Sequence, residues 1–212
     1  MSALTKLESH FGVPLPRGYV DWNSKHYLDY HNHADKYLWV NEAEWIPPED
    51  IPEYDLGRVN IIRSLIPFAV SGRGDHWCWN TQVCNSSAEY EILFCLHDED
   101  LAEAYAPTFP AWYYSNCLYY AAGTLDNSPE SIDKARNNLR LWSQRLSEIY
   151  SGSWVDHLAS LAEATPFEYK HPKLRADVVL FGFITAMDVE RIVANEFGRR
   201  YLDEKVKWGE FA

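Results

Sequence analysis

Residues 65 to 79 indicate most clearly how this chain folds. They read Leu65-Ile66-Pro67-Phe68-Ala69-Val70-Ser71-Gly72-Arg73-Gly74-Asp75-His76-Trp77-Cys78-Trp79. An apolar run opens the stretch and an aromatic run closes it, and small and polar residues separate the two. Because aromatic and β-branched residues favour strands while Gly and Asp favour turns, this pattern predicts two antiparallel strands joined by a tight turn.

The turn between these strands has the residues that tight turns require. We expect Gly72 and Gly74 to adopt positive φ angles, which glycine tolerates without steric cost. The Asp75 carboxylate is expected to accept hydrogen bonds from turn amides. We interpret Gly72, Gly74 and Asp75 as structural turn residues.

Further strands and a helix are expected downstream of the turn. Alternation along the second strand predicts that Trp77 and Trp79 lie on one face of the sheet. A third short run at Tyr90–Leu96 extends the pair into an antiparallel meander. The aromatic stretch Thr108–Ala122 has the length of a helix and is expected to cover one face of the sheet. These patterns predict the α+β class.

The residues before the meander predict two short helices and a strand. Ser2 can cap a first helix that Gly12 ends, and Pro16 suits the first turn of a second helix. The polar residues 26–36 are expected to form a loop, followed by a strand at Tyr37–Val40.

The residues after the meander predict a second part of the chain. We place a boundary in the turn at Asp126–Pro129, which gives a core domain over residues 1–126. Residues 127–212 are expected to form a mainly helical C-terminal extension packed on that core. Its first long amphipathic helix is expected to begin at Ser128.

Three segments together resemble the SUKH superfamily, a group of bacterial immunity proteins and yeast cell-wall regulators. Residues 13–19 (Val-Pro-Leu-Pro-Arg-Gly-Tyr) are similar to the start of the family's second helix. Residues 65–79 are similar to its strand–turn–strand, and residues 90–100 to its next strand with an acidic end. The stretch 108–120 takes the place of the family's late helix, so the resemblance covers residues 1–122.

This resemblance implies a fold and a function. The fold is a twisted antiparallel sheet flanked by helices, without chemistry of its own. Bacterial members usually neutralise a cognate toxin, often a nuclease or a deaminase, by binding it. The resemblance therefore predicts an immunity protein, while an intracellular regulatory scaffold of the yeast type is an alternative. It does not predict the toxin's identity or the oligomeric state.

The charge of the chain narrows its possible partners. The formal net charge is −12, and residues 1–126 hold 7 Lys/Arg against 18 Asp/Glu, whereas residues 127–212 hold 12 against 13. Nucleic acids and anionic lipids require basic surfaces, so we expect neither to be a partner. The negative field of the first part would steer a basic partner inward, or it would serve only to keep the protein soluble.

Residues 41–57 concentrate this charge in one segment. The segment has three prolines and six acids but no Lys or Arg, which predicts an irregular acidic surface. We expect it to bind a basic toxin, with Trp45 as an exposed aromatic anchor. The expected partner-binding acids are Glu42, Glu44, Glu49, Asp50, Glu53 and Asp55, and the next choice is Asp98, Glu99 and Asp100.

The sequence also carries expectations about the protein's environment. Residues 1–6 lack the pattern of a signal peptide, and no apolar run approaches about 18 residues. We therefore expect a cytoplasmic protein, with no membrane partner. The four cysteines, Cys78, Cys84, Cys95 and Cys117, have apolar and aromatic neighbours and are expected to be buried and reduced.

One cluster suggests an enzymatic alternative. The segment His31-Asn32-His33-Ala34-Asp35 has the His-x-His-x-Asp spacing found in metal-dependent hydrolases. Alternate residues of an extended segment point the same way, so these three side chains could converge on one metal ion. A second set of ligands is only weakly supported by the sequence, and P-loop and Gly-x-Ser-x-Gly motifs are absent from it. We therefore expect a non-catalytic protein with no catalytic residue, cofactor or bound metal, and keep a hydrolase using His31, His33 and Asp35 as the alternative.

Overall fold

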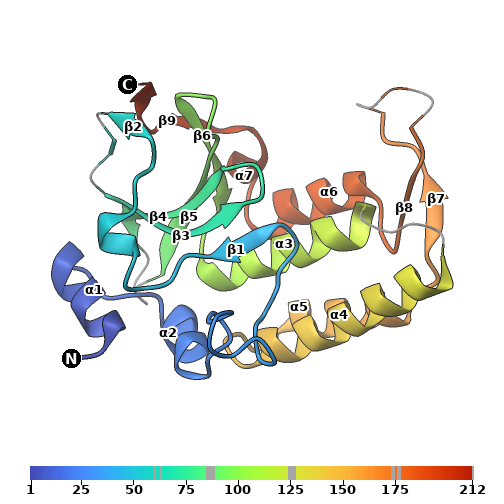
Figure 1. Ribbon diagram of the computed structural model, residues 1–212. Coiled ribbons are helices and arrows are strands. Elements are labelled where there is room, and N and C mark those ends of the chain that lie inside the picture. The colour runs from blue at the N-terminus through green and yellow to red at the C-terminus, as the bar shows by residue number, and fades with distance from the viewer. Residues whose placement is uncertain are drawn as a thin grey trace. The chain divides into compact units, whose positions relative to one another are not determined.

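The computed structural model describes residues 1–59, 61–62, 64–84, 89–123, 128–172, 175 and 178–211 (Figure 1). Contacts divide the chain into two compact units. The first, here called the sheet unit, comprises Met1–Trp112 and Arg199–Ala212, and the second, the helical unit, comprises Tyr113–Gly198.

The helices and strands of the sheet unit, in chain order, are α1 (Ala3–Phe11), α2 (Arg17–Ser24), β1 (Ala43–Trp45), a 3-10 helix (Ile51–Glu53), β2 (Arg58–Val59), β3 (Leu65–Ser71), β4 (His76–Cys84), β5 (Tyr90–Cys95), β6 (Leu101–Ala106), the first turn of α3 (Phe109–Gly123), α7 (Arg200–Asp203), β9 (Lys205–Lys207) and β10 (Glu210–Phe211).

A six-stranded antiparallel sheet forms the centre of this unit, in the order β1-β3-β4-β5-β6-β9. Strands β3 to β6 follow one another as a meander, so the predicted α+β class and meander are confirmed. Pro67 lies inside β3, and the register against β4 shifts between Pro67 and Ala69. A bulge tolerates proline in a central strand because the regular ladder, which needs an N–H at every second position, is interrupted there.

The two N-terminal helices begin where the sequence predicts, and the first also ends at the predicted glycine. The Ser2 side chain accepts a hydrogen bond from the Thr5 amide, and Gly12 ends α1 with a φ of 69°. Pro16 directly precedes α2, so its missing N–H costs the helix no hydrogen bond.

One face of the sheet is covered by aromatic side chains. The Trp79 ring stacks on Phe68 with centroids 4.6 Å apart, and the Trp77 ring lies 6.0 Å from that of Trp112 on α3. Tyr19 of α2 meets Trp79 edge to face at 4.8 Å. Trp77 and Trp79 therefore share a face, as alternation along the strand predicts.

The opposite face is covered by the C-terminal residues. Trp208 is fully buried there in a cluster that includes Cys78, Leu93 and Cys95. Its indole N–H donates to the Glu99 carbonyl at 2.9 Å. The C-terminal end of the chain thus returns to the N-terminal unit and adds strand β9 beside β6.

The turn between β3 and β4 differs in detail from the prediction. Gly74 has a φ of 90°, but Gly72 does not adopt a positive φ. The Ser71 hydroxyl accepts from the turn amides of Arg73 and Asp75. The Asp75 carboxylate instead accepts from the Ser71 hydroxyl and from the His97 amide. Ser71 is therefore the hydrogen-bond acceptor for the turn amides, whereas Asp75 links the turn by hydrogen bonds to His97, just after the end of β5.

Other expectations need correction. Residues 37–39 form no strand, because Leu38 donates its amide to the Tyr27 carbonyl and so ties the loop back on itself. The strand forms instead at Ala43–Trp45, inside the segment expected to be irregular. Cys84 is exposed, whereas the other three cysteines are buried, and none of the four forms a disulfide bond.

The helical unit contains the rest of α3, then α4 (Pro129–Ser147), α5 (Ser153–Glu163), β7 (Phe167–Tyr169), β8 (Leu180–Gly182) and α6 (Ala186–Glu196). Ser128 caps α4, as expected. The predicted boundary involved residues 126 and 127, which lie outside the described residues. The compact units divide after Trp112 and again before Arg199. In the described parts of both units, no helix has the length and apolarity that crossing a membrane requires.

Candidate interaction surface and pocket

The acidic segment at residues 41–57 is held in place by buried anchors. Strand β1 pairs with β3, so alternation buries Ala43 and Trp45 while Glu44 faces solvent. Beyond the strand, the Ile46 amide donates to the Phe68 carbonyl at 3.0 Å, and Ile51 is buried in the 3-10 helix. The six exposed acids between and beside these anchors are Glu42, Glu44, Glu49, Asp50, Glu53 and Asp55.

Trp45 does not have the exposure that we expected. Its side chain is 7 % exposed, and its indole N–H donates to the Leu38 carbonyl at 2.7 Å. The ring lies 5.3 Å from Trp112 and 6.4 Å from Trp22, within the aromatic core. Its place in strand β1 decides this, because the side chain must point opposite to that of Glu44.

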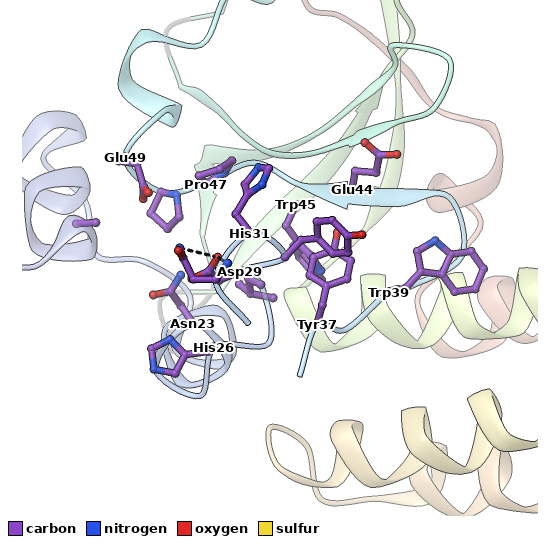
Figure 2. A pocket seen from close by; sticks show the side chains of 15 residues that line it. Asn23, His26, Asp29, His31, Tyr37, Trp39, Glu44, Trp45, Pro47 and Glu49 are labelled. Atoms are coloured by element: carbon purple, nitrogen blue, oxygen red, sulfur yellow. Dashed lines mark hydrogen bonds between the residues drawn. The ribbon is translucent and has the colours of Figure 1, made fainter. Parts of the chain in front are cut away.

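A pocket of about 480 Å³ lies beside the acidic segment (Figure 2). It forms where residues 26–39 fold against β1 and the two prolines that follow it. None of its lining residues is Lys or Arg. They are Ala3, Asn23, His26, Leu28, Asp29, Tyr30, His31, Asn32, Tyr37, Trp39, Glu44, Trp45, Pro47, Pro48 and Glu49.

The walls of this pocket combine aromatic rings with carboxylates. Tyr30 and Trp39 are 60 % and 42 % exposed, so both rings are accessible to a partner. Partial burial, together with the nearby Glu44 carboxylate, raises the pKa of Tyr37. Aromatic faces and carboxylates both attract a guanidinium or an ammonium group. The pocket therefore has the chemistry to bind a basic side chain.

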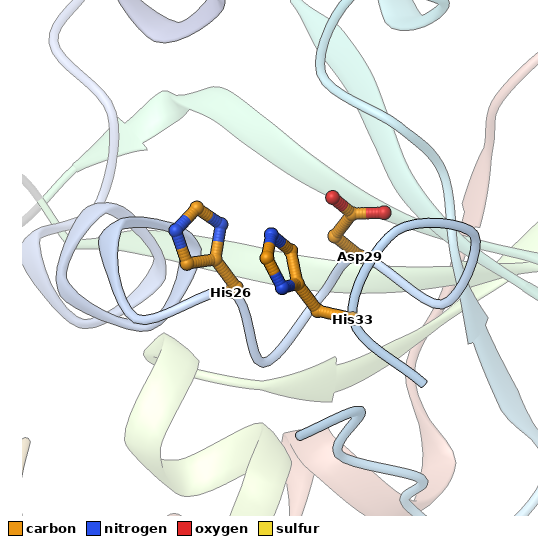
Figure 3. Close-up of side chains that lie close together, drawn as sticks. All are labelled: His26, Asp29 and His33. Atoms are coloured by element: carbon orange, nitrogen blue, oxygen red, sulfur yellow. The ribbon is translucent and has the colours of Figure 1, made fainter. Parts of the chain in front are cut away.

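The loop that forms one wall of the pocket also brings two histidines together. The rings of His26 and His33 are tilted by 31° with their centroids 3.9 Å apart, and the Asp29 carboxylate lies beside them (Figure 3). His31 and Asp35, which the sequence pattern paired with His33, are exposed and belong to no such group among the described residues. The loop is folded into turns, so alternate residues do not point the same way.

The second acidic group is partly offset by lysines. Asp98 is exposed, but Glu99 pairs with Lys205 of β9 at 3.0 Å. Hydrogen bonding to Glu99 raises the pKa of Lys205. A hydrogen bond to Glu210 is the main cause that raises the pKa of Lys207, and Asp100 adds a smaller effect. Asp98, Glu99 and Asp100 therefore offer less unbalanced charge than the segment at residues 41–57.

The pocket was not predicted from the sequence. Its wall comes from residues 26–36, which were expected to be a solvated loop. One signal was present, because Tyr30, Tyr37 and Trp39 place three large aromatic side chains within ten residues of an otherwise polar stretch. Rings in such a setting either pack against the domain or present an interaction surface.

The sheet unit has an α+β fold, with a six-stranded antiparallel sheet and the short helices α1, α2 and α7. Residues 2–112 match the model of the family SUKH_6, described as SMI1-KNR4 cell-wall. The match spans more than half of the chain and ends where the first segment of the sheet unit ends. The chain therefore belongs to this family, and the resemblance to the SUKH superfamily is confirmed. Neither the curated proteins nor the solved structures gave a match.

Proposed function

We propose that this protein is a cytoplasmic immunity protein that neutralises a cognate basic toxin by binding it directly, without catalysis. Membership of the SUKH superfamily supports a protein-binding role, because the immunity proteins of that group work in this way. The acidic surface of the sheet unit supports a basic partner. The family relationship leaves the toxin's own activity open.

The observation that carries the proposal is the geometry of the acidic segment. Six carboxylates project from residues 42–55, and buried residues between them hold the backbone in place. A fixed surface loses little conformational entropy when a partner binds. Its charge also raises the rate at which a basic partner arrives.

The pocket gives this surface a specific feature. A guanidinium or ammonium group from the toxin would enter between Tyr30, Tyr37 and Trp39 and meet the carboxylates of Glu44 and Glu49. Enclosure of a charged side chain by aromatic rings excludes water from the contact and strengthens it. In this proposal the exposed rings take the anchoring role that the sequence had suggested for Trp45.

The proposal predicts that a gene beside the one for this protein encodes a toxin domain, and the test uses that domain. We expect co-expression to protect bacteria from that domain, and the two purified proteins to elute together in size-exclusion chromatography. Cells that die despite equal expression of this protein, with no complex in vitro, would reject the immunity function. A gene neighbourhood without any toxin would favour the alternative of a regulatory scaffold.

A further inference from the structure

The group formed by His26, Asp29 and His33 has the composition of a metal site. Each residue offers one ligand atom, and these atoms all lie within 4.8 Å of one another. In tetrahedral zinc sites, bonds of about 2.0–2.1 Å place ligand atoms about 3.3 Å apart. The distances between the three ligand atoms therefore need to shorten by at most about 1.5 Å. Rotation of the exposed His26 side chain can bring its ring nitrogen that much nearer to the other two ligand atoms.

The backbone fixes how Asp29 and His33 meet. The His33 amide donates to the Asp29 carbonyl at 3.1 Å. The two residues are four apart, so this hydrogen bond closes one turn of helical type. Residues four apart in such a turn present their side chains on the same side. The Asp29 carboxylate is also held by Asn32, whose backbone amide and side-chain amide donate to it at 3.0–3.2 Å. Hydrogen bonds of this kind commonly orient the carboxylates that bind metals.

His26 reaches the group from the end of helix α2. The Tyr27 amide donates to the Trp22 carbonyl and the His26 amide donates to the Asn23 carbonyl. This is the Schellman arrangement, in which the residue at His26's position adopts a left-handed conformation and is usually glycine. His26 has a φ of 63°. An imidazole thus stands where glycine would be less strained, and its ring lies over His33.

We propose that His26, Asp29 and His33 form a binding site for Zn²⁺. Two imidazole nitrogens and one carboxylate oxygen are ligands that zinc accepts, whereas Ca²⁺ and Mg²⁺ prefer oxygen ligands. Three protein ligands leave a fourth tetrahedral position for water or a partner's side chain. This set differs from the His31, His33 and Asp35 set of the sequence pattern, and it revises our expectation that the chain binds no metal.

A metal ion at this site would fix the conformation of the loop that forms one wall of the pocket. His26 and Asp29 both line the pocket, and the loop between them and Leu38 has turns but no regular helix or strand. A bound ion would connect the end of α2 to the turn at residues 29–33. It would hold this wall in one conformation before a partner arrives.

The test uses the full chain after treatment with EDTA. Isothermal titration with Zn²⁺ is expected to give one ion per chain, and Co²⁺ is expected to give the intense visible bands of tetrahedral coordination. Mg²⁺ should give no heat. His33→Ala and His26→Gly should each weaken Zn²⁺ binding at least about tenfold. His31→Ala, a neighbouring histidine outside the group, is the matched control and should bind like the parent protein.

The variants separate binding from folding. His26→Gly should melt at the same or a higher temperature than the parent protein, because glycine suits its left-handed backbone. Absence of zinc binding to the parent protein would overturn the proposal. Loss of binding in His31→Ala together with normal binding in His26→Gly would also overturn it, because the ligands would then be those of the sequence pattern. The test uses no toxin, so its outcome is independent of the proposed function.

Discussion

The turn at residues 71–75 shows how single residues hold the meander together. Sequence reasoning identified Gly74 and Asp75 as turn residues, but it assigned the turn amides to the wrong acceptor. The Ser71 hydroxyl reaches these amides because it sits at the start of the turn, whereas the Asp75 side chain points toward His97. Glycine content alone could not distinguish Gly74 from Gly72, since only the folded backbone decides which φ is positive.

Gly74 provides a test of the turn. Gly74→Ala should lower the free energy of unfolding by about 1–3 kcal/mol, because a side chain is strained at a φ of 90°. The added Cβ would meet His97 at an ordinary distance of 3.9 Å, so a steric clash does not contribute. Gly72→Ala is the matched control and should stay within about 0.5 kcal/mol, because that glycine has no positive φ. Equal urea midpoints for the two variants would contradict this account.

Asp75 should make stability depend on pH. Burial raises the pKa of its carboxyl, but hydrogen bonds from His97 and Ser71 outweigh burial and lower the pKa below its usual value. Stability from this group is therefore present above the unfolded pKa of about 4 and is lost as pH falls through the lower folded pKa. Urea unfolding between pH 6 and pH 2 should show a smaller loss of stability in Asp75→Asn than in the parent protein. Asp98→Asn, an exposed neighbour, should keep the parent's pH dependence; an unchanged profile in Asp75→Asn would contradict the assignment.

Substitutions of Trp39 and Trp45 should have different effects, one mainly on toxin binding and the other mainly on stability. Trp45→Ala should destabilise the protein by about 3–5 kcal/mol, because it empties part of the aromatic core. Trp39→Ala should destabilise the protein much less than Trp45→Ala and weaken toxin binding by about 2 kcal/mol or more, since its ring is 42 % exposed and lines the pocket. Calorimetric titration against the toxin measures the second effect. Normal toxin affinity in Trp39→Ala would remove the pocket from the interface.

At the scale of elements, the sequence predicted what local patterns determine. Helix α1, helix α2 and strands β3 to β5 follow from caps, turn residues and alternation, all of which act within a few residues. Strand β9 could not be predicted in this way, because its pairing with β6 joins Ala102 to Val206, which are 104 residues apart in the sequence. The pocket was missed for the same reason, since folding of residues 26–39 against β1 depends on tertiary contacts.

The C-terminal segment offers a test at this scale. Trp208→Ala should lower the free energy of unfolding by about 3–5 kcal/mol, because Trp208 is fully buried on one face of the sheet. Leu101→Ala, on the strand that pairs with β9, is the control; its side chain is 40 % exposed, so the change should cost less than about 1 kcal/mol. Chemical denaturation of both variants measures the difference. A Trp208→Ala protein as stable as the parent would show that the C-terminal segment does not belong to the sheet unit.

For the whole molecule, charge is distributed unevenly between the two units. The sheet unit holds 11 Lys/Arg and 20 Asp/Glu, and the helical unit 8 and 11. The acidic balance therefore lies mainly in the unit that matches the family. Composition indicated this bias, but only the structure shows that the six acids of residues 42–55 are all exposed. If a local surface binds the toxin, only the acids at residues 42–55 should affect the association rate. If net charge alone matters, acids elsewhere should affect the rate equally.

The most direct test of the proposed interface compares two fourfold variants in association kinetics with the toxin domain. One neutralises Glu42, Glu44, Glu49 and Asp50; the control neutralises the exposed acids Glu130, Asp133, Asp156 and Glu168 of the helical unit, which changes the net charge equally. Surface plasmon resonance at low and high salt should show slower association at low salt for the first variant, with the control close to the parent, because charges at an interface steer association. Equal association rates for the two variants would show that residues 42–50 are not part of the interface.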